Sequence, residues 1–361
     1  MTGAPDTTTP QAASASTEGA RAATLHVPVL LGEVLEALAP RPGGRYLDGT
    51  VGLGGHSAAI MERIGPDGEL CCLDRDTTAL ELARQRLAPW GDRVHFFHTR
   101  YADFEAALDQ LGWDKVDGAL IDIGVSSMQI DMADRGFSFH ADGPLDMRMD
   151  QDGDEDPASR LVNRATVDVL KDIILRYGED PMAGRIARAI VDARAAGPIE
   201  TTAQLAAIVD RAYPAKWRAT SRNHPATRTF QALRMAVNDE LGQLERFLDR
   251  ILDRLNPGGR LAVITFHSLE DRIVKHRLRD ESQGCVCPRS VSRCECGHKA
   301  RVDVLTRKPV TATDVELARN SRASSAKLRA AQRLAEGQAP RPRRRNKYAP
   351  DTRDEGQGGA S

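Results

Sequence analysis

The sequence has few aromatic residues, few cysteines and no long apolar run. No stretch approaches the ~20 consecutive apolar residues of a membrane-spanning helix, which argues against a membrane protein. Lys and Arg number 50 against 51 Asp and Glu, so no net field recruits nucleic acid and any RNA contact must come from local patches. Segment 1–24 lacks the apolar core of a signal peptide. We therefore expect a disordered tail there and a cytoplasmic protein.

The six cysteines argue against a disulfide framework, because a cytosolic chain favours thiols or a metal. Cys71 and Cys72 lie within a predicted strand, and the other four form two C-x-C pairs at 285–287 and 294–296. Four thiolates so close in sequence can bind zinc tetrahedrally, with free thiols in a flexible loop as the alternative. Their role is structural, and we assign no metal to the reaction. Segment 281–361 is predicted to hold this loop and a basic, largely disordered tail.

A glycine-dense turn between a strand and a helix is the feature that the sequence does contain. The apolar run at 45–47 ends on Asp48, the turn carries Gly52 and Gly54, and a helix follows over 57–64. Strand, glycine turn and helix form the ligand crevice of an open α/β sheet. An ordinary glycine turn without a ligand is the alternative.

The spacing of the turn favours one ligand over another. A dinucleotide fingerprint, Gly-x-Gly-x-x-Gly, would need a glycine where this chain has Ser57. The carboxylate of Asp48 would repel a pyrophosphate and suits a ligand with an ammonium group. S-adenosylmethionine is such a ligand, with a cationic amino-acid end and no phosphate. A dinucleotide-dependent oxidoreductase is therefore disfavoured.

The second strand, over 69–74, places another acid at the same edge. It ends on Asp74, where a Rossmann-like unit has the carboxylate that accepts hydrogen bonds from ribose hydroxyls. We expect Asp74 in that role, with Asp76 as its competitor. The alternative is that Asp74 merely begins a turn and caps the helix over 78–87.

Two further strands complete the predicted first half of the sheet. The strand at 94–98 precedes Tyr101, whose ring can stack on adenine or belong to the core. The strand at 116–123 is almost continuously apolar, as a buried parallel strand should be. Its end carries Asp122 and small hydroxyl residues, beside the expected reactive end of the cofactor.

The alternation of strands and helices then stops. After a loop rich in glycine and charge, residues 130–223 show helical patterns at 158–163, 167–177, 181–196 and 202–212. We expect a small helical domain inserted after a first core part at 25–129. An insert at this edge overhangs the crevice, which suits substrate recognition. A merely structural insert is the alternative.

The second part of the core is predicted over 224–280. A long helix runs from its start through 255, followed by a tight turn at 256–260 and a strand at 261–266. A helix that ends in Pro-Gly-Gly before an apolar strand is typical of methyltransferase-like domains.

Taken in order, these motifs resemble the bacterial 16S rRNA (cytosine-N4)-methyltransferase family. They are D-G-T-x-G-x-G-G-H-S from Asp48, D-R-D from Asp74, D-I-G-V-S-S from Asp122, R-G-F-S-F and D-G-P-L-D-M-R-M-D from Arg135, H-P-A-T-R-T-F-Q-A-L-R from His224 and F-H-S-L-E-D-R-I-V-K from Phe266. The resemblance begins with H-x-P-V-L at His26 and runs to the arginine- and serine-rich segment at 319–329.

The resemblance implies a Rossmann-like class I methyltransferase core that uses S-adenosyl-L-methionine. Its substrate would be the exocyclic N4 amine of a cytosine in 16S rRNA of the small ribosomal subunit. The family's cofactor contacts fall here on Gly54, Gly55, His56, Asp74, Tyr101, Asp122 and Gln129. The rival interpretation is a non-catalytic S-adenosylmethionine-binding factor for ribosome assembly.

An exocyclic amine is a poor nucleophile, so we expect a polar group that holds it and accepts its proton. The candidates are acid, hydroxyl and imidazole side chains: Asp122 first, with Ser126 or Ser127, and more weakly His140, His224 and His267. Amino-methyltransferases carry acid/Asn-Pro-Pro-aromatic at this strand tip, where this chain has Asp-Ile-Gly-Val. Arg228 and Arg272 are candidates for phosphate contacts, with surface ion pairs as the alternative.

Overall fold

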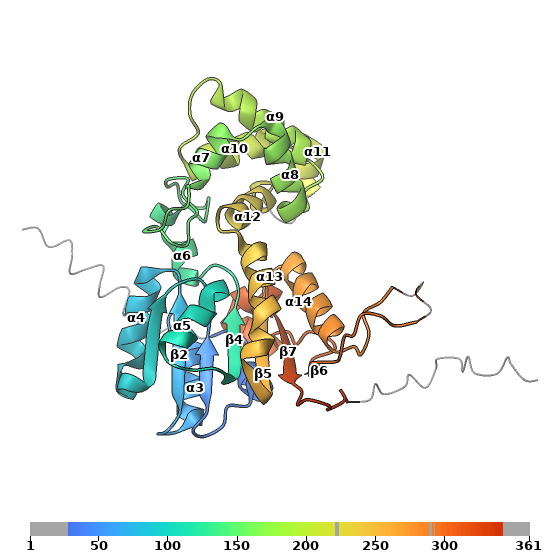
Figure 1. Cartoon of the computed structure of the whole chain (residues 1–361). Helices are drawn as coiled ribbons and strands as arrows, with labels where there is room; N and C mark the ends of the chain where they lie inside the picture. The colour runs from blue at the N-terminus through green and yellow to red at the C-terminus, as the bar shows by residue number, and fades with distance from the viewer. Residues whose placement is uncertain (1–27, 221–223, 289–290, 292, 342–361) are drawn as a thin grey trace, which may run out of the picture.

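A seven-stranded sheet forms the centre of the protein (Figure 1). The computed structural model describes residues 28–220, 224–288, 291 and 293–341. The strand order is β3-β2-β1-β4-β5-β7-β6; neighbours among the first five strands pair in parallel, and β7 lies antiparallel between β5 and β6. The order reverses between β1 and β4, which is the switch point of a doubly wound sheet. The predicted Rossmann-like α/β fold is confirmed.

The early strands lie where the sequence predicts them. The seven strands of the sheet are β1 (Arg45–Asp48), β2 (Glu69–Asp74), β3 (Val94–His98), β4 (Val116–Asp122), β5 (Leu255–Thr265), β6 (Val302–Val304) and β7 (Lys327–Arg333). The bounds of β2 and β3 match the prediction, and β1 and β4 differ from it by one residue.

Helices cover both faces of the sheet. One face packs on α2 (Leu31–Leu38), α3 (Gly55–Ile64) and α4 (Thr77–Leu87), and the other on α5 (Phe104–Gln110), α13 (Glu240–Arg250) and α14 (Ser268–Glu281). Successive side chains of β4 point to opposite faces, so Leu120 belongs to the first core and Ala119 and Ile121 to the second. Burial on both faces explains why this strand is apolar throughout.

A group of helices between β4 and β5 has a hydrophobic core of its own. Its members are α7 (Ala158–Arg164), α8 (Val167–Gly178), α9 (Ala183–Arg194), α10 (Thr202–Ala212), α11 (Ala215–Thr220) and α12 (Ala226–Val237). Leu170, Ile186, Leu205 and Phe230 are among the residues of this third core. In Figure 1 the group stands at the top, above the upper ends of the strands. Helix α12 packs into it, although it follows the predicted boundary at 223.

The predicted long helix from 224 through 255 is wrong, because the chain breaks between α12 and α13. Asp239 has a φ of 48°, a left-handed conformation that an α-helix cannot contain. The side chain of Asn238 donates from Nδ2 to the Met147 carbonyl (2.8 Å) and accepts at Oδ1 from the Met149 amide (2.9 Å). The break is therefore fixed by a loop 91 positions earlier in the chain.

The tight turn predicted at 256–260 lies inside β5 and not before it: Gly258 has a φ of 84°, and the strand that contains it begins at Leu255. Leu255 pairs with Val116 and Arg260 with Gly118, so the extra residues of β5 are absorbed as a bulge in the ladder. The strand thus begins six residues earlier than the predicted start at 261.

After residue 280 the sequence predicts only a cysteine-containing loop and a tail, and the structure corrects this. Strand β7 pairs with β5 from Arg260↔Gln332 to Thr265↔Lys327, and β6 pairs with β7. The tail at 1–24, His26 and the basic residues from 342 on lie outside the described residues. Within the described part of the chain, no helix has both the length and the apolar character needed to cross a membrane.

Candidate active site

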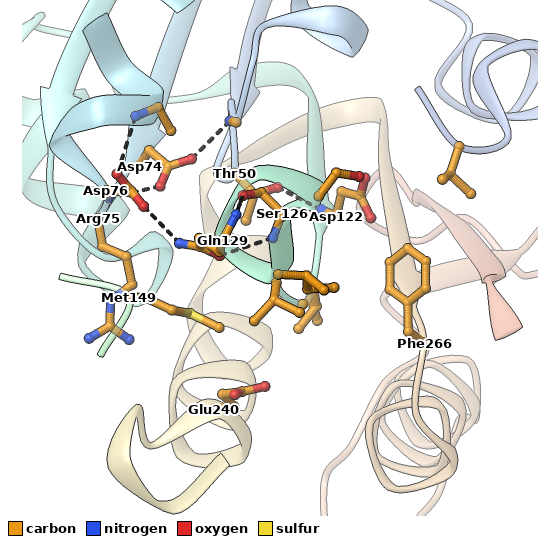
Figure 2. A pocket seen from close by; sticks show the side chains of 18 of the residues that line it. Thr50, Asp74, Arg75, Asp76, Asp122, Ser126, Gln129, Met149, Glu240 and Phe266 are labelled. Atoms are coloured by element: carbon orange, nitrogen blue, oxygen red, sulfur yellow. Dashed lines mark hydrogen bonds between the residues drawn. The ribbon is translucent and has the colours of Figure 1, made fainter. Parts of the chain in front are cut away.

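A cavity of about 480 Å³ lies at the carboxyl ends of β1, β2 and β4 (Figure 2). Its position is the switch point of the sheet, where open α/β folds bind ligands. Six of the seven residues expected to contact a cofactor line it: Gly55, His56, Asp74, Tyr101, Asp122 and Gln129. Gly54 lies just behind, at the N-cap of α3 with a φ of 75°. The structure brings these residues together, and their contact with a cofactor stays a prediction.

The glycine turn is held tightly against its neighbours. A Cβ on Gly55 would lie 2.3 Å from the ring of Pro28, and a Cβ on Gly54 would lie 3.3 Å from the Leu87 side chain. The Gly52 amide donates a hydrogen bond of 2.8 Å to Asp74 Oδ2, which ties the turn to the end of β2. Glycine is therefore required at Gly55 by packing as well as by ligand approach.

Asp74 and Asp76 have different roles in the structure. Asp76 is 3% exposed; its Oδ1 accepts from the amides of Thr78 and Ala79 and so caps α4, and its Oδ2 accepts from Gln129 and Arg135. Asp74 accepts only from the amides of Gly52 and Asp76 and lines the cavity. Asp74 thus keeps lone pairs for a ligand, whereas the helix cap is Asp76.

Asp48 does not line the cavity, which corrects the expectation that it faces an ammonium group. Its side chain is 1% exposed. Oδ2 accepts from the Ser57 hydroxyl (2.6 Å) and Oδ1 from the Thr50 amide (3.1 Å). Burial raises the pKa of this carboxyl. Asp48 therefore stabilises the turn between β1 and α3, and Ser57 is its partner.

Gln129 lies at the start of α6 (Ser127–Asp131) and is 5% exposed. Its Nε2 donates to Asp76 Oδ2 (2.8 Å) and its Oε1 accepts from the Ser126 amide (2.9 Å). The Ser126 hydroxyl in turn accepts from the Gln129 amide, which completes a capping box. Both residues hold the loop after β4 in place, while the neighbouring Ser127 also lines the cavity.

Asp122 and His56 face each other with unused polar atoms. The Asp122 amide donates to Thr50 Oγ1 (2.6 Å), which fixes the end of β4 against the glycine turn. Its Oδ2 lies 3.7 Å from His56 Nε2. Asp122 Oδ1 and both ring nitrogens of His56 are buried without a hydrogen-bond partner. Because buried polar atoms are normally paired, these atoms fit a site that a ligand completes.

Of the three histidines that are candidates for proton transfer, one lines the cavity and two do not. His267 lines the cavity, and burial lowers the pKa of its imidazole to about 4. His140 is exposed and His224 accepts from the Ala226 amide, and neither lines the cavity.

The two predicted phosphate-contacting arginines also lie outside the cavity lining. Arg228 donates to the Glu179 carbonyl (3.1 Å), and Arg272 pairs with the Glu179 carboxylate (3.2 Å). Both therefore join α12 and α14 to the end of α8, as ordinary surface ion pairs and hydrogen bonds would.

Tyr101 lies at the side of the cavity formed by β3 and α13. Its ring packs edge-on against Phe247, with centroids 5.6 Å apart, and its hydroxyl donates to the Glu240 carbonyl (3.3 Å). Burial raises the pKa of the hydroxyl well above its usual value. The ring is thus held rigidly, as a stacking surface requires.

Sequence reasoning missed several lining residues. Arg234 makes a bidentate pair with the buried Glu240, with both contacts at 2.8 Å. Arg322, Ser324 and Ser325 reach the cavity from the segment before β7. Arg234 ends the H-P-A-T-R-T-F-Q-A-L-R motif, which was the available signal for it.

Comparisons with known proteins place the chain among methylases. The sequence profile of the MraW methylase family matches residues 23–334. The chain is 96% identical over 361 residues to a protein of Nitratidesulfovibrio vulgaris (strain DSM 19637 / Miyazaki F) named Ribosomal RNA small subunit methyltransferase H, with 100% of both chains covered. The protein of that name from Oleidesulfovibrio alaskensis is 68% identical over 311 residues, 86% of this chain and 96% of its own. Among solved structures, an rRNA methylase from Streptococcus thermophilus aligns with 84% of this chain and 94% of its own, at 10% identity and a TM-score of 0.36.

Proposed function

Because the chain belongs to the MraW methylase family, we propose that it methylates the exocyclic N4 amine of a cytosine in 16S rRNA, with S-adenosylmethionine as methyl donor. The observation that carries this proposal is the cavity at the switch point, with Asp74 at one side and Asp122 with His56 at the other. A substrate amine and a cofactor can meet between them. The relatives' name supports rRNA of the small ribosomal subunit as the substrate.

The cavity residues offer partners to two parts of the cofactor, its ribose and its adenine. Asp74 is placed to accept hydrogen bonds from the two ribose hydroxyls, and the ring of Tyr101 offers a surface to the adenine. When bound, S-adenosylmethionine supplies an electrophilic methyl group on a sulfonium sulfur. The unpaired atoms of Asp122 and His56 lie where polar groups of cofactor or substrate can satisfy them.

The chemical step depends on orientation and on a proton acceptor. The lone pair of a cytosine amine is delocalised into the ring, so the amine must be held in line with the methyl group. The Asp122 carboxylate lines the cavity, where it is placed to accept a hydrogen bond from this amine and then its proton. Thr50 holds the backbone of Asp122 in place for this task.

The target base must leave its stack to reach the cavity. RNA bases are methylated on their edges only when they are unstacked and held in a pocket. The end of α12 contributes Gln231, Arg234 and Asn238 to the cavity lining, so the helical group reaches the same site as the sheet. We assign the holding of the RNA around the flipped base to this group.

Transfer of a labelled methyl group to small ribosomal subunits that lack their native modification tests the proposal. We expect N4-methylcytidine among the nucleosides that mass spectrometry resolves after digestion of the 16S rRNA. Naked 16S rRNA in parallel shows whether the assembled subunit is needed. Tight cofactor binding without any transfer, to subunits or to naked rRNA, would instead favour the non-catalytic assembly factor.

Cofactor binding should depend on pH through Asp74. Burial raises the pKa of Asp74 to about 6, so the carboxylate is ionised at neutral pH and becomes protonated below that value. A protonated carboxyl accepts the ribose hydroxyls less well. The Kd for S-adenosylmethionine in calorimetry should therefore be constant above about pH 7 and rise by up to about tenfold per unit below pH 6.

The Asp74→Asn variant is the control for this pH dependence. It should bind S-adenosylmethionine weakly at every pH and lack the change in Kd near pH 6. Burial lowers the pKa of His267 to about 4 and raises that of Glu270 to about 7. Glu270 therefore titrates close to Asp74, but it does not line the cavity, and a step in Kd that it caused would persist in Asp74→Asn. An unchanged pH profile in Asp74→Asn would contradict the role of Asp74.

A further inference from the structure

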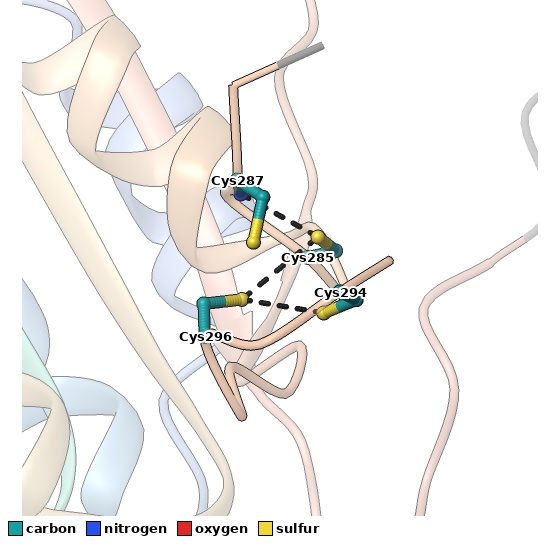
Figure 3. Close-up of side chains that lie close together, drawn as sticks. All are labelled: Cys285, Cys287, Cys294 and Cys296. Atoms are coloured by element: carbon teal, nitrogen blue, oxygen red, sulfur yellow. Dashed lines mark hydrogen bonds between the residues drawn. The ribbon is translucent and has the colours of Figure 1, made fainter. Parts of the chain in front are cut away.

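Four cysteine side chains meet in the loop between α14 and β6 (Figure 3). The sulfur atoms of Cys285, Cys287, Cys294 and Cys296 all lie within 4.8 Å of one another. The sulfurs of Cys294 and Cys296 are 3.6 Å apart, and those of Cys285 and Cys296 are 3.8 Å apart. All four are free thiols. None of them lines the cavity described above, so the proposed methyl transfer does not use them.

The spacing of the sulfur atoms fits a single tetrahedral ion. With a Zn–S distance of about 2.3 Å, tetrahedral geometry puts neighbouring sulfurs about 3.8 Å apart. A disulfide would need a distance of about 2.05 Å. An iron–sulfur cluster would spread the sulfurs further, because its four thiolates are shared among two or four irons. We propose that these four cysteines form a structural zinc site.

The loop has the composition of a segment that needs such a site. Its apolar side chains Val286 and Val291 are 45% and 42% exposed, so they form no core. The two ends of the loop are joined by a hydrogen bond of 2.7 Å, which the Arg301 amide donates to the Glu281 carbonyl. Between these ends, a metal can replace the missing hydrophobic core.

The site is closed and lies away from the reaction. Four thiolates fill the coordination sphere of zinc and leave no open position for a substrate, which marks a structural rather than a catalytic ion. Each thiol loses its proton when it binds, so zinc uptake releases protons. In Figure 1 the loop projects beside β6, at the edge of the sheet opposite β3. Metal removal should therefore leave cofactor binding unchanged.

Metal analysis of the full-length protein, purified with a reductant and without chelator, tests the site. We expect about one zinc per chain by mass spectrometry. Cys285→Ser and Cys294→Ser should each lose it. His298→Ala is the matched control: it follows Cys296 by two residues, but its Nε2 is bonded to the Asp280 carbonyl (3.1 Å), so zinc content should not change. Loss of zinc in His298→Ala would contradict the four-cysteine site.

Cobalt(II) substitution and limited proteolysis give two further readouts. Cobalt bound by four thiolates should show strong sulfur-to-metal charge-transfer absorption, and it should vanish in Cys294→Ser. With zinc removed, trypsin should cleave faster after Arg293 and Lys299. An as-purified protein without metal, with all four thiols open to alkylation or joined in disulfides, would overturn the proposal.

Discussion

Replacement of Asp122 by Asn should abolish most methyl transfer while the cofactor still binds. Asn keeps the size of the side chain and leaves the backbone bond to Thr50 in place, but it cannot accept the amine proton. Loss of a general base lowers kcat by about 10²–10⁴-fold. We expect a loss in this range in the rate constant of single-turnover transfer to small subunits. The cofactor Kd should stay within about tenfold of the wild-type value.

A second variant in the same cavity makes this result specific. His267→Ala removes the other titratable candidate that lines the cavity, and we expect less than about a tenfold loss of kcat. If His267→Ala were the more damaging change, or if Asp122→Asn kept most of its activity, the proton acceptor would not be Asp122. Loss of cofactor binding in Asp122→Asn would show a binding role instead.

Replacement of Asp76 by Ala should destabilise the protein strongly. The Asp76 and Arg135 side chains form an ion pair at 2.8 Å and are 4% and 5% exposed, so the change leaves a buried guanidinium without its partner. Breaking such a pair costs about 3–5 kcal/mol. The same variant removes the cap of α4 and the partner of the Gln129 amide. Urea unfolding followed by circular dichroism should show the loss as a lower midpoint.

Two comparisons separate the buried charge from the cap. Asp76→Asn retains side-chain acceptors for the amides of α4 but not the charge, so it should fall between wild type and Asp76→Ala. Asp172→Ala breaks the exposed pair with Arg176 and should cost less than about 1 kcal/mol. Equal effects of Asp76→Ala and Asp172→Ala would refute the importance of burial.

The first half of the sheet is predictable because its signals are local. An apolar run that ends on an acid, such as β2, is contained within a few residues, and both β2 and β3 have the predicted bounds. The sequence of β7, KLRAAQR, has no such pattern. It becomes a strand because its backbone pairs with β5 on one side and β6 on the other, which no local pattern reports.

The cavity is predictable in its outline and not in its details. Glycine spacing and acids at strand ends locate Gly52, Asp74 and Asp122. The same reasoning misplaces Asp48, because a hydrogen bond to Ser57 turns its carboxylate away from the cavity. Arg322 is not predictable at all, since only the path of the chain after α14 brings it to the cavity. In both cases, contacts between residues that no local pattern links decide whether the side chain faces the cavity.

The position of β7 sets the order in which the protein can be completed during its synthesis. A ribosome delivers the chain from its N-terminus, so β1 to β5 emerge before the strand that lies between β5 and β6. Until residue 333 has left the exit tunnel, β5 presents an unpaired edge whose residues are apolar, and the wall containing Arg322 is missing. A nascent chain that stops before β7 is thus an aggregation hazard without an active cavity, and the enzyme becomes functional only near the end of translation.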